Sequence, residues 1–334
     1  MGPRTLIRSA LSRTGLVRAK WRLLRPGLYC FNYHRVGDPQ STEFDRNTFS
    51  CTAHGFEEHL EFFQHHFEVV NLDRLAGGCR GRPSGKRKAF ALITFDDGYI
   101  DNYSIAFPAL RQYGLSAVFF LPTSFVGSTD IPWWDEIAYL LRSAAGRAIK
   151  LNSSSQPFVI ERDNTEPCIR RVFSFVKSRP MPLVVQVEEI RHACGGQESP
   201  NLSNGRRLFL NWDHAREMRS AGMDIGSHTH THRVLAHLTE REQKAELGNS
   251  RDILESQLGA PISSVAYPVG SRSAYTLETC NLAKETGYRF GFNFQRRNNG
   301  LPLGRPLDIG RLAVNWGVTP HKLRSMICFP RVFR

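Results

Sequence analysis

Apolar and polar residues alternate along this chain in blocks that predict strands and helices in turn. Short apolar runs predict strands over 27–33, 67–72, 89–95, 116–121, 223–227, 262–267 and 288–294. Amphipathic stretches predict helices over 102–113, with a kink at Pro108, and over 133–145, 212–220, 239–259 and 277–286. This order of elements predicts an α/β fold built from repeated βα units.

The regular pattern is interrupted once, by a polar, turn-rich tract that ends near Arg207. The tract is too long for an ordinary loop, so we expect a polar, helical insertion at about 133–207. A chain of 334 residues with 41% hydrophobic content exceeds the roughly 200 to 250 residues of one α/β barrel. We therefore expect a barrel domain over 27–334 and a basic N-terminal extension over 1–26.

Two predicted strands are followed by residues that suit metal chemistry. Asp96 and Asp97 follow the strand 89–95, and the run 228–232, His-Thr-His-Thr-His, follows the strand 223–227. An Asp pair before glycine is often a turn or a helix cap, and a His-rich run is often a solvated loop. Their joint position after two strands favours a shared site, because sites in α/β folds gather at strand ends.

A hydrolytic metal site needs three His or carboxylate ligands, an open position for water and a nearby base. One aspartate of the pair suits the ligand role while its neighbour stays free as the base. A helical turn after Ser227 would put His228 and His232 on one face, with His230 pointing away, whereas an extended chain would put all three on one side. We expect the helical turn, because the strand ends at Ser227.

These two segments resemble the first and second motifs of the polysaccharide deacetylases with a NodB-type domain, carbohydrate esterase family 4. The matching segments are 94–99, Thr-Phe-Asp-Asp-Gly-Tyr, and 228–232, which fits H-[ST]-x-x-H. The resemblance implies a distorted (β/α) barrel of about seven strands that removes N-acetyl groups from the amino sugars of a glycan. It further implies one divalent metal ion, typically zinc, on Asp97, His228 and His232, with Asp96 as general base.

The same resemblance assigns other residues by weaker matches. It implies that Thr229 braces the histidine loop and that Tyr99 is a candidate contact for substrate. The segment 265–270 resembles a variant of the third motif that begins with Ala instead of Arg. Its turn, with Tyr267 and Pro268, would form a wall of the substrate-binding groove and offer the Val269 N–H to the oxyanion. The missing arginine leaves the base without its usual partner, for which Arg311 is the candidate; a buried structural role for Arg311 is the alternative.

The last motif of the family, a Leu and a His near the C-terminus, is not recognisable. The segment 31–36 instead resembles the start of members whose barrel is circularly rearranged, which makes His34 the candidate acid. The alternatives are that His34 packs on the barrel rim or that His321 is the acid. Trp133 and Trp134 either stack on sugar rings or anchor the start of a helix by packing.

The cysteine content and the basic N-terminal extension indicate the cellular compartment and the partners that we expect. Seven scattered cysteines without C-x-x-C spacing argue against a disulfide framework and favour a reducing compartment. The extension 1–26 is rich in Arg, has no acidic residue and lacks the apolar run of a signal peptide. We expect a cytoplasmic protein, peripheral at the inner face of the membrane if the extension forms a helix on anionic lipid. A frayed basic arm is the alternative for this segment.

The net charge of +13 would also suit nucleic acid, but the chain shows no recognition helix, zinc finger or RNP-like aromatic pattern. We therefore expect no nucleic-acid partner and an acetylated amino-sugar glycan, either a polymer or a lipid-linked precursor, as the substrate. A phosphoesterase usually needs a second metal, for which no second cluster of ligands is evident. The alternative outside catalysis is a carbohydrate-binding protein with a degenerate deacetylase site.

Overall fold

A computed structural model of the protein describes residues 15–81, 83, 87, 89–179, 181–198, 202, 207–330 and 332. The chain divides into two compact units, named here the barrel unit and the insertion unit. The barrel unit comprises Met1–Gly37, Phe49–Ser128 and Phe209–Arg334, and the insertion unit comprises Asp38–Thr48 and Thr129–Leu208. The insertion unit thus includes an early segment, 38–48, that the hydrophobic pattern does not separate from the barrel.

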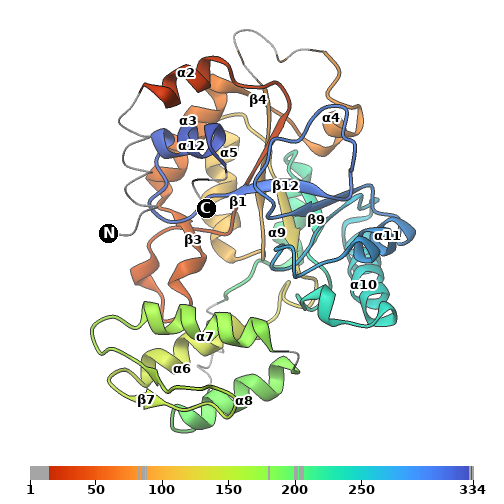
Figure 1. Ribbon diagram of the computed structural model, residues 1–334. Helices are drawn as coiled ribbons and strands as arrows, with labels where there is room; N and C mark the ends of the chain where they lie inside the picture. The colour runs from red at the N-terminus through yellow and green to blue at the C-terminus, as the bar shows by residue number, and fades with distance from the viewer. Residues whose placement is uncertain are drawn as a thin grey trace. The chain divides into compact units, whose positions relative to one another are not determined.

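Seven parallel strands of the described residues close into a barrel in the order β1, β5, β6, β9, β10, β11 and β12. Figure 1 shows β1, β9 and β12 at the centre of the barrel unit, with helices outside them. β1 closes the ring because it pairs with β5 on one side and with β12 on the other. The strands are β1 (Leu28–Tyr33), β5 (Ala89–Phe95), β6 (Val118–Leu121), β9 (Asp224–Ser227), β10 (Ser264–Ala266), β11 (Phe290–Asn293) and β12 (Ile309–Ala313). β4 (Phe67–Val69) adds to β5, and β2 (Arg35–Val36) pairs with β3 (Phe49–Cys51). The prediction of a (β/α) barrel of about seven strands is confirmed.

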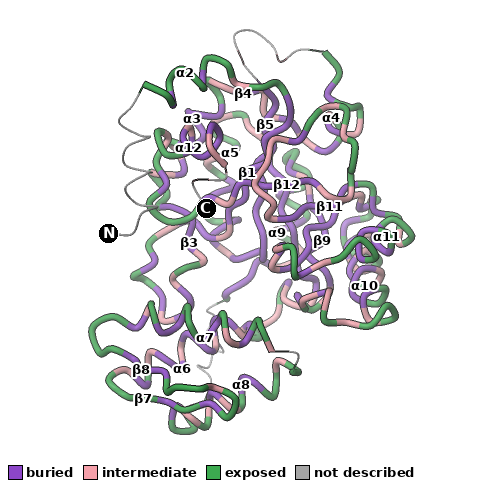
Figure 2. Tube along the Cα trace, viewed as in Figure 1, coloured by how far each residue is buried: buried purple, intermediate pink, exposed green. Residues whose placement is uncertain are grey.

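Helices surround this barrel, as expected of βα units. They are α2 (Leu16–Arg22), α3 (Ala53–His66), α4 (Leu72–Ala76), η3 (Asn102–Ala106), α5 (Phe107–Gln112), α9 (Trp212–Ser220), η4 (Leu235–His237), α10 (Glu240–Leu258), α11 (Leu277–Glu285) and α12 (Pro320–Cys328). Figure 2 shows the strands buried and the exposed residues concentrated on the outer helices and loops.

The core has two layers because successive strand residues point to opposite faces. Cys30 and Leu92 belong to one buried cluster, and Phe31 and Ile93, the next residue in each strand, belong to the other. Every residue of β1 and β5 is buried, as expected of parallel strands covered on both faces. This packing fixes the positions of the strand ends. The candidate site residues Asp96, Asp97 and His228 come directly after two of these ends, those of β5 and β9.

Two predicted elements differ from the structure. The predicted helix 102–113 begins as a π-helical turn, η3, before α5; Pro108 has no N–H to donate within a regular turn, which explains the widening. The predicted strand 67–72 stops at Val69, because the Asn71 side chain caps α4 by accepting a hydrogen bond from the Arg74 N–H.

The described part of the N-terminal segment packs on the barrel unit. Val17 and Trp21 of α2 are buried, and the Trp21 ring contacts Phe62 and Phe67 edge to face or tilted. These two side chains therefore cannot also form a lipid-facing surface. Residues 1–14 of the predicted membrane-binding extension lie outside the described residues. None of the described helices has the length and apolar character needed to cross a bilayer.

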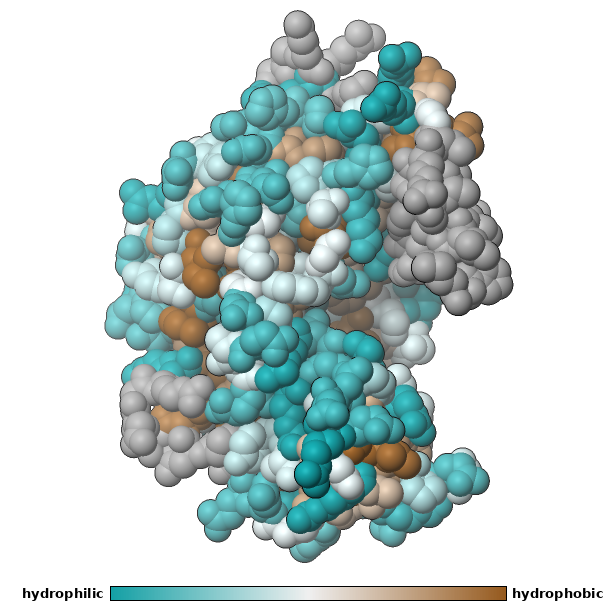
Figure 3. Space-filling model, turned by 90° about the vertical axis from the view of Figure 1, so that its left-hand side faces the viewer, coloured by the Kyte–Doolittle hydropathy of each residue, from teal (hydrophilic) through white to brown (hydrophobic). Residues whose placement is uncertain are grey.

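The insertion unit is mainly helical. It contains η1 (Pro39–Ser41), η2 (Arg46–Thr48), α6 (Trp133–Ser143), β7 (Ala148–Ile149), β8 (Phe158–Val159), α7 (Glu166–Ser178) and α8 (Leu183–Ala193). The Asp45 N–H donates to Asp135 Oδ1 at 2.9 Å and Arg142 pairs with Glu166, so segment 38–48 and the helices hold one another. Figure 3 shows one face of the molecule as mostly hydrophilic, with hydrophobic residues in small, separate patches.

Candidate active site

Asp96 and Asp97 lie immediately after β5, at the carboxyl end of the barrel. The Asp96 N–H donates to the Tyr33 carbonyl at 3.0 Å, which ties the pair to the end of β1. Asp97 has a φ of 73° and Gly98 a φ of 68°, so the chain turns through two left-handed residues. A Cβ at Gly98 would lie 2.9 Å from Leu121 Cδ2, which explains the glycine. The turn sends the two adjacent carboxylates to different partners.

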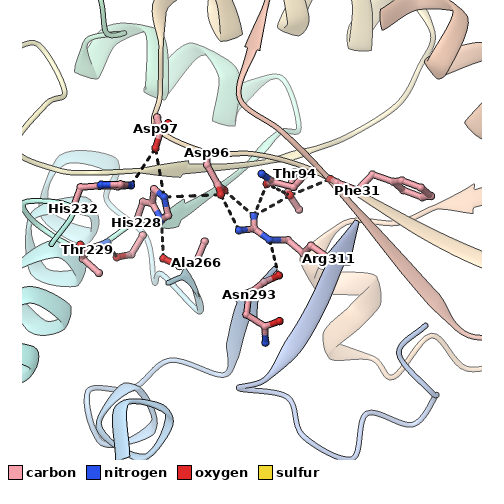
Figure 4. Close-up of polar contacts among 12 residues, drawn as sticks. Phe31, Thr94, Asp96, Asp97, His228, Thr229, His232, Ala266, Asn293 and Arg311 are labelled. Atoms are coloured by element: carbon pink, nitrogen blue, oxygen red, sulfur yellow. Dashed lines mark hydrogen bonds and ion pairs between the residues drawn. The ribbon is translucent and has the colours of Figure 1, made fainter. Parts of the chain in front are cut away.

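Asp97 faces the two outer histidines of the run 228–232 (Figure 4). Its Oδ1 lies 3.5 Å from His228 Nε2 and 3.4 Å from His232 Nε2, and the three side chains are buried. A tetrahedral cation with bonds of about 2.0–2.2 Å separates its ligand atoms by roughly 3.3–3.6 Å. Asp97 Oδ1 has no hydrogen-bond partner among the described residues. These three residues therefore fit a divalent metal ion.

The loop that carries these histidines is not the helical turn that we predicted. Thr229 and His232 both have positive φ, at 65° and 57°, so the loop folds back on itself instead of following a helix. His230 points away from Asp97, and its Nδ1 lies 2.8 Å from Thr123 Oγ1. His228 and His232 are thus brought together by a folded-back loop and not by a helical turn.

Two groups outside the run 228–232 hold the loop. Glu246, on α10, accepts hydrogen bonds from the backbone N–H groups of His230 and Thr231 at 3.0 and 2.8 Å. The Ala266 carbonyl lies 2.7 Å from His228 Nδ1, which leaves Nε2 to face Asp97. The Thr229 hydroxyl is buried without a partner among the described residues, so Thr229 does not brace the loop through its side chain.

Asp96 is held by a bidentate ion pair with Arg311 of β12. Arg311 donates to Asp96 Oδ1 from Nη1 at 2.7 Å and to Oδ2 from Nη2 at 2.8 Å, and both side chains are fully buried. Nη1 also contacts Asn32 Oδ1 and Thr94 Oγ1. Asp96 Oδ2 is 3.9 Å from His228 Nε2, so this oxygen borders the three candidate ligands.

Electrostatics keeps both carboxylates ionised. Burial alone would raise the pKa of Asp96, but the Arg311 guanidinium and the His228 imidazole outweigh it and lower this pKa. Burial opposes ionisation of Asp97 as well, and the imidazoles of His228 and His232 bring its pKa well below the ordinary value.

His34 follows β1 and lies beside this pair. Its imidazole contributes to lowering the pKa of Asp96 and of Asp97. Its ring is parallel to that of Phe294, with centroids 6.0 Å apart. The His34 backbone is fixed from both sides, because its N–H donates to Ser50 Oγ at 3.0 Å and its carbonyl accepts from Asn102 Nδ2 at 2.7 Å. The alternative acid, His321, is exposed on α12.

Two of the predicted substrate contacts, Tyr99 and Trp134, are packing residues instead. Tyr99 is fully buried against Phe209, and Trp134 is only 6% exposed, so neither can offer a ring face to a sugar. Trp133 is half-buried and contacts Trp134 and Phe173 edge to face, so its predicted role in binding stays a prediction.

The turn that was expected to wall the groove is mostly buried too. Tyr267 is fully buried, and its hydroxyl donates to the Leu307 carbonyl at 2.9 Å, so Tyr267 does not form the wall. Pro268 is also buried. Val269 is half-buried with a φ of 62°, and its N–H has no hydrogen-bond partner within the described part of the chain. Of this turn, only the Val269 N–H stays available for the predicted oxyanion contact.

Known proteins resemble this chain in sequence and in fold. Residues 84–291 match the family model for polysaccharide deacetylases. The Bacillus subtilis protein YxkH, provisionally assigned as a polysaccharide deacetylase, is 24% identical over 200 residues, which cover 60% of this chain and 43% of YxkH. This chain therefore aligns with less than half the length of that relative.

Two solved structures share the fold over most of the chain. The deacetylase PplD of Streptococcus pyogenes, solved with acetate, has a TM-score of 0.57 and 17% identity, covering 91% of this chain and 99% of PplD. IcaB of Ammonifex degensii has a TM-score of 0.57 and 18% identity, covering 91% of this chain and 98% of IcaB. At these identities the likeness concerns the fold.

Proposed function

Since this chain belongs to the polysaccharide deacetylase family, we propose that it is a metal-dependent hydrolase that removes N-acetyl groups from amino sugars of a glycan. The observation that carries the proposal is that two adjacent aspartates have different partners. Asp97 faces two imidazoles at ligand spacing, whereas Asp96 is paired with a guanidinium beside them. This arrangement supplies three ligands and a separate base.

Asp97, His228 and His232 would hold the ion, for which we propose Zn²⁺. When bound, such an ion polarises the acetamide carbonyl and makes a bound water more acidic. The Ala266 carbonyl fixes the tautomer of His228, because Nδ1 must carry the proton that it shares with that carbonyl. Nε2 is thereby left unprotonated and would be free to bind the ion.

Asp96 would act as the base. The carboxylate is ionised because Arg311 neutralises its charge, and Oδ2 borders the ligand residues at 3.9 Å from His228 Nε2. Asp96 removes a proton from the water while the water oxygen forms a bond to the acetamide carbon. Arg311 keeps the carboxylate in position for this transfer, which is the base-orienting role predicted for it.

The remaining steps concern the developing oxyanion and the leaving group. The half-buried Val269 N–H would donate to the carbonyl oxygen as it gains charge. The carbon–nitrogen bond then breaks, and His34 protonates the departing sugar nitrogen. The products are acetate and a free amino sugar, so a neutral position of the glycan becomes a cation.

The alternative is a carbohydrate-binding protein with a degenerate site, suggested by the third-motif arginine that this chain lacks. Arg311, from β12, makes a bidentate contact with Asp96 from another strand. The missing arginine therefore does not by itself indicate a degenerate site. The described residues contain one group of three metal-binding side chains, which favours a single-metal hydrolase over a two-metal phosphoesterase.

The test is acetate release by the purified, metal-loaded protein across a panel of acetylated amino-sugar oligomers. We expect turnover on at least one member, its loss with a chelator and its recovery when metal is returned. Asp224→Asn, which changes a half-buried aspartate at the start of β9, is the matched control and should keep turnover. Sugar binding without acetate release from any substrate would support the carbohydrate-binding alternative.

A further inference from the structure

The candidate histidine ligands lie on the loop 228–232, which helix α10 holds from one side. α10 packs against β9, the strand that leads into this loop. Glu246 and Ser250 lie about one helical turn apart on α10. Ser250 is fully buried and Glu246 is 6% exposed. Burial takes water away as an alternative partner, so the hydrogen bonds of these two side chains are costly to lose.

Glu246 accepts three hydrogen bonds from the middle of the loop. Its Oε2 accepts from the N–H groups of His230 and Thr231 at 3.0 and 2.8 Å, and its Oε1 accepts from the Thr231 hydroxyl. Successive N–H groups of an extended chain point to opposite sides, whereas these two converge on one oxygen, as in an anion-binding nest. The carboxylate therefore favours the folded-back form of the segment between His228 and His232.

Ser250 holds the start of the same loop. Its hydroxyl lies 2.7 Å from that of Ser227, and the Ser227 hydroxyl accepts from the Thr229 N–H at 3.0 Å. Thr229 has a φ of 65°, a left-handed conformation that residues other than glycine adopt at a cost in free energy. The N–H groups of residues 229, 230 and 231 are thus held by side chains of α10, directly or through Ser227.

The other edge of the loop is held by the segment that follows β6. The Thr123 N–H donates to the Thr229 carbonyl at 3.2 Å, and the Ser124 N–H donates to the His230 carbonyl at 3.0 Å. These bonds fix carbonyl groups and leave the N–H groups to α10. Removing Glu246 should therefore loosen the loop on one edge without detaching it from the barrel.

The conformation of this loop bears on metal binding. Asp97 Oδ1 lies 3.5 Å from His228 Nε2 and 3.4 Å from His232 Nε2. Figure 4 shows the two imidazole rings directed at Asp97 from the two ends of the loop. A loop that is already held in this form loses less conformational freedom when its histidines bind an ion.

We propose that Glu246 is a positioning residue for the metal site, because it holds the loop in the form that brings His228 and His232 to Asp97. The inference rests on the proposed function, since it concerns the metal ion which that function requires. It deepens the function by naming a residue outside the run 228–232 that sets metal affinity.

Zinc affinity of the purified, metal-free protein, measured by competition with a chromophoric chelator, tests this proposal. Glu246→Ala removes the three acceptor contacts and should weaken zinc binding by roughly 10- to 100-fold, the usual cost of losing an outer partner of a metal site. Glu246→Gln keeps an oxygen for the two N–H groups and gains an amide that can donate to the Thr231 hydroxyl. Its zinc affinity should stay within about fivefold of the wild type, because neutral hydrogen bonds are weaker than charged ones.

Glu255→Ala is the matched control. Glu255 also lies on α10, and its side chain accepts a backbone N–H, that of Ile262, at 2.9 Å. Ile262 precedes β10 and is not part of the histidine loop, so this variant should bind zinc as the wild type does. Urea unfolding of the metal-free proteins should show similar losses of stability for the two alanine variants, although only Glu246→Ala loses zinc affinity.

Two further measurements separate positioning from a general loss of structure. Thr231→Val changes an exposed residue and removes one of the three hydrogen bonds, so it should weaken zinc binding by roughly two- to fivefold even if Glu246→Ala does not fold. The visible spectrum of bound Co²⁺ depends on how its ligands are arranged. We expect this spectrum to change in Glu246→Ala and to stay as in the wild type in Glu246→Gln.

The outcomes distinguish this inference from the proposed function. Wild-type zinc affinity of folded Glu246→Ala would overturn the positioning role and leave the deacetylase proposal standing. Equal losses in the alanine and glutamine variants would also overturn it, because the effect would then come from the charge and not from the hydrogen bonds. A wild-type protein that binds no zinc would overturn both proposals.

Discussion

Asp96 and Asp224, which lie at opposite ends of the barrel strands, show how differently a buried and a half-buried aspartate behave. Asp96 follows the carboxyl end of β5 and has the two guanidinium nitrogens of Arg311 within 2.8 Å. Asp224 opens β9 at the other end, and its Oδ2 accepts from the Leu72 N–H at 2.7 Å. The pKa of Asp96 is lowered, whereas burial raises the pKa of Asp224 to about 6.

Burial acts in the same direction on both carboxyl groups, so the difference comes from the partner. A backbone N–H offsets part of the desolvation of Asp224, but a bidentate guanidinium reverses the effect at Asp96. Partners from several strands meet at the carboxyl end, since Asn32, Thr94 and Arg311 come from β1, β5 and β12. This end is therefore where the fold stabilises buried charge for chemistry.

Removing the Arg311 guanidinium should have the largest effect on this difference between Asp96 and Asp224. Arg311→Met leaves Asp96 as an unpaired buried charge, which costs about 3–5 kcal/mol of stability. We expect this loss in urea unfolding at neutral pH, together with loss of acetate release. The double variant Asp96→Asn/Arg311→Met should recover much of the stability and none of the turnover. Wild-type stability of the single variant would show that the ion pair does not hold the site.

The sequence identified Asp96, Asp97, His228 and His232 because each follows an apolar strand at the end where such sites gather. It also pointed to Arg311, because the family resemblance leaves the base without its usual arginine and Arg311 was the candidate to replace it. The alternation of strand and helix patterns indicated repeated βα units, although no predicted strand covers β12, and the barrel of about seven strands was implied by the family resemblance. The βα units depend on local periodicity and the barrel on short motifs, and a single sequence records both.

Other parts of the site have no local signal. The Ala266 carbonyl that orients His228 is a backbone group, and any residue at that position would supply it. Glu246 lies on the buried side of an otherwise ordinary polar helix, 14 residues after His232. Tyr99 was predicted as a substrate contact from the family resemblance and Trp134 from its residue type, and tertiary packing buries both. Long-range contacts decide these features, so sequence patterns did not show them.

A second prediction concerns how the carboxyl end positions His34. Asn102→Ala removes the donor to the His34 carbonyl and should lower kcat for amide substrates by up to roughly 100-fold, the cost of a misplaced catalytic group. An activated aryl acetate has a leaving group that needs no proton, so its hydrolysis should change little. Parallel steady-state assays of the two substrates check this. Equal losses on both would assign Asn102 a purely structural role.

The smallest expected effect is that of a change at Asp224, at the start of β9. The folded pKa of Asp224, about 6, lies above that of an unfolded aspartate, so its contribution favours folding below about pH 4 and is lost as pH rises past 6. Asp224→Asn should therefore raise stability at pH 8 by up to about 3 kcal/mol and have little effect at pH 4. Urea unfolding at both pH values measures this. A variant less stable than the wild type at pH 8 would contradict the assigned pKa direction.

The most direct test compares Asp96→Asn with Asp97→Asn for zinc affinity and acetate release in the same preparations. We predict that Asp96→Asn binds zinc within about threefold of the wild type and loses at least roughly 100-fold in turnover, as expected for a missing base. Asp97→Asn should lose both zinc and turnover. Full activity of Asp96→Asn, or zinc loss equal to that of Asp97→Asn, would contradict the division of the pair into base and ligand.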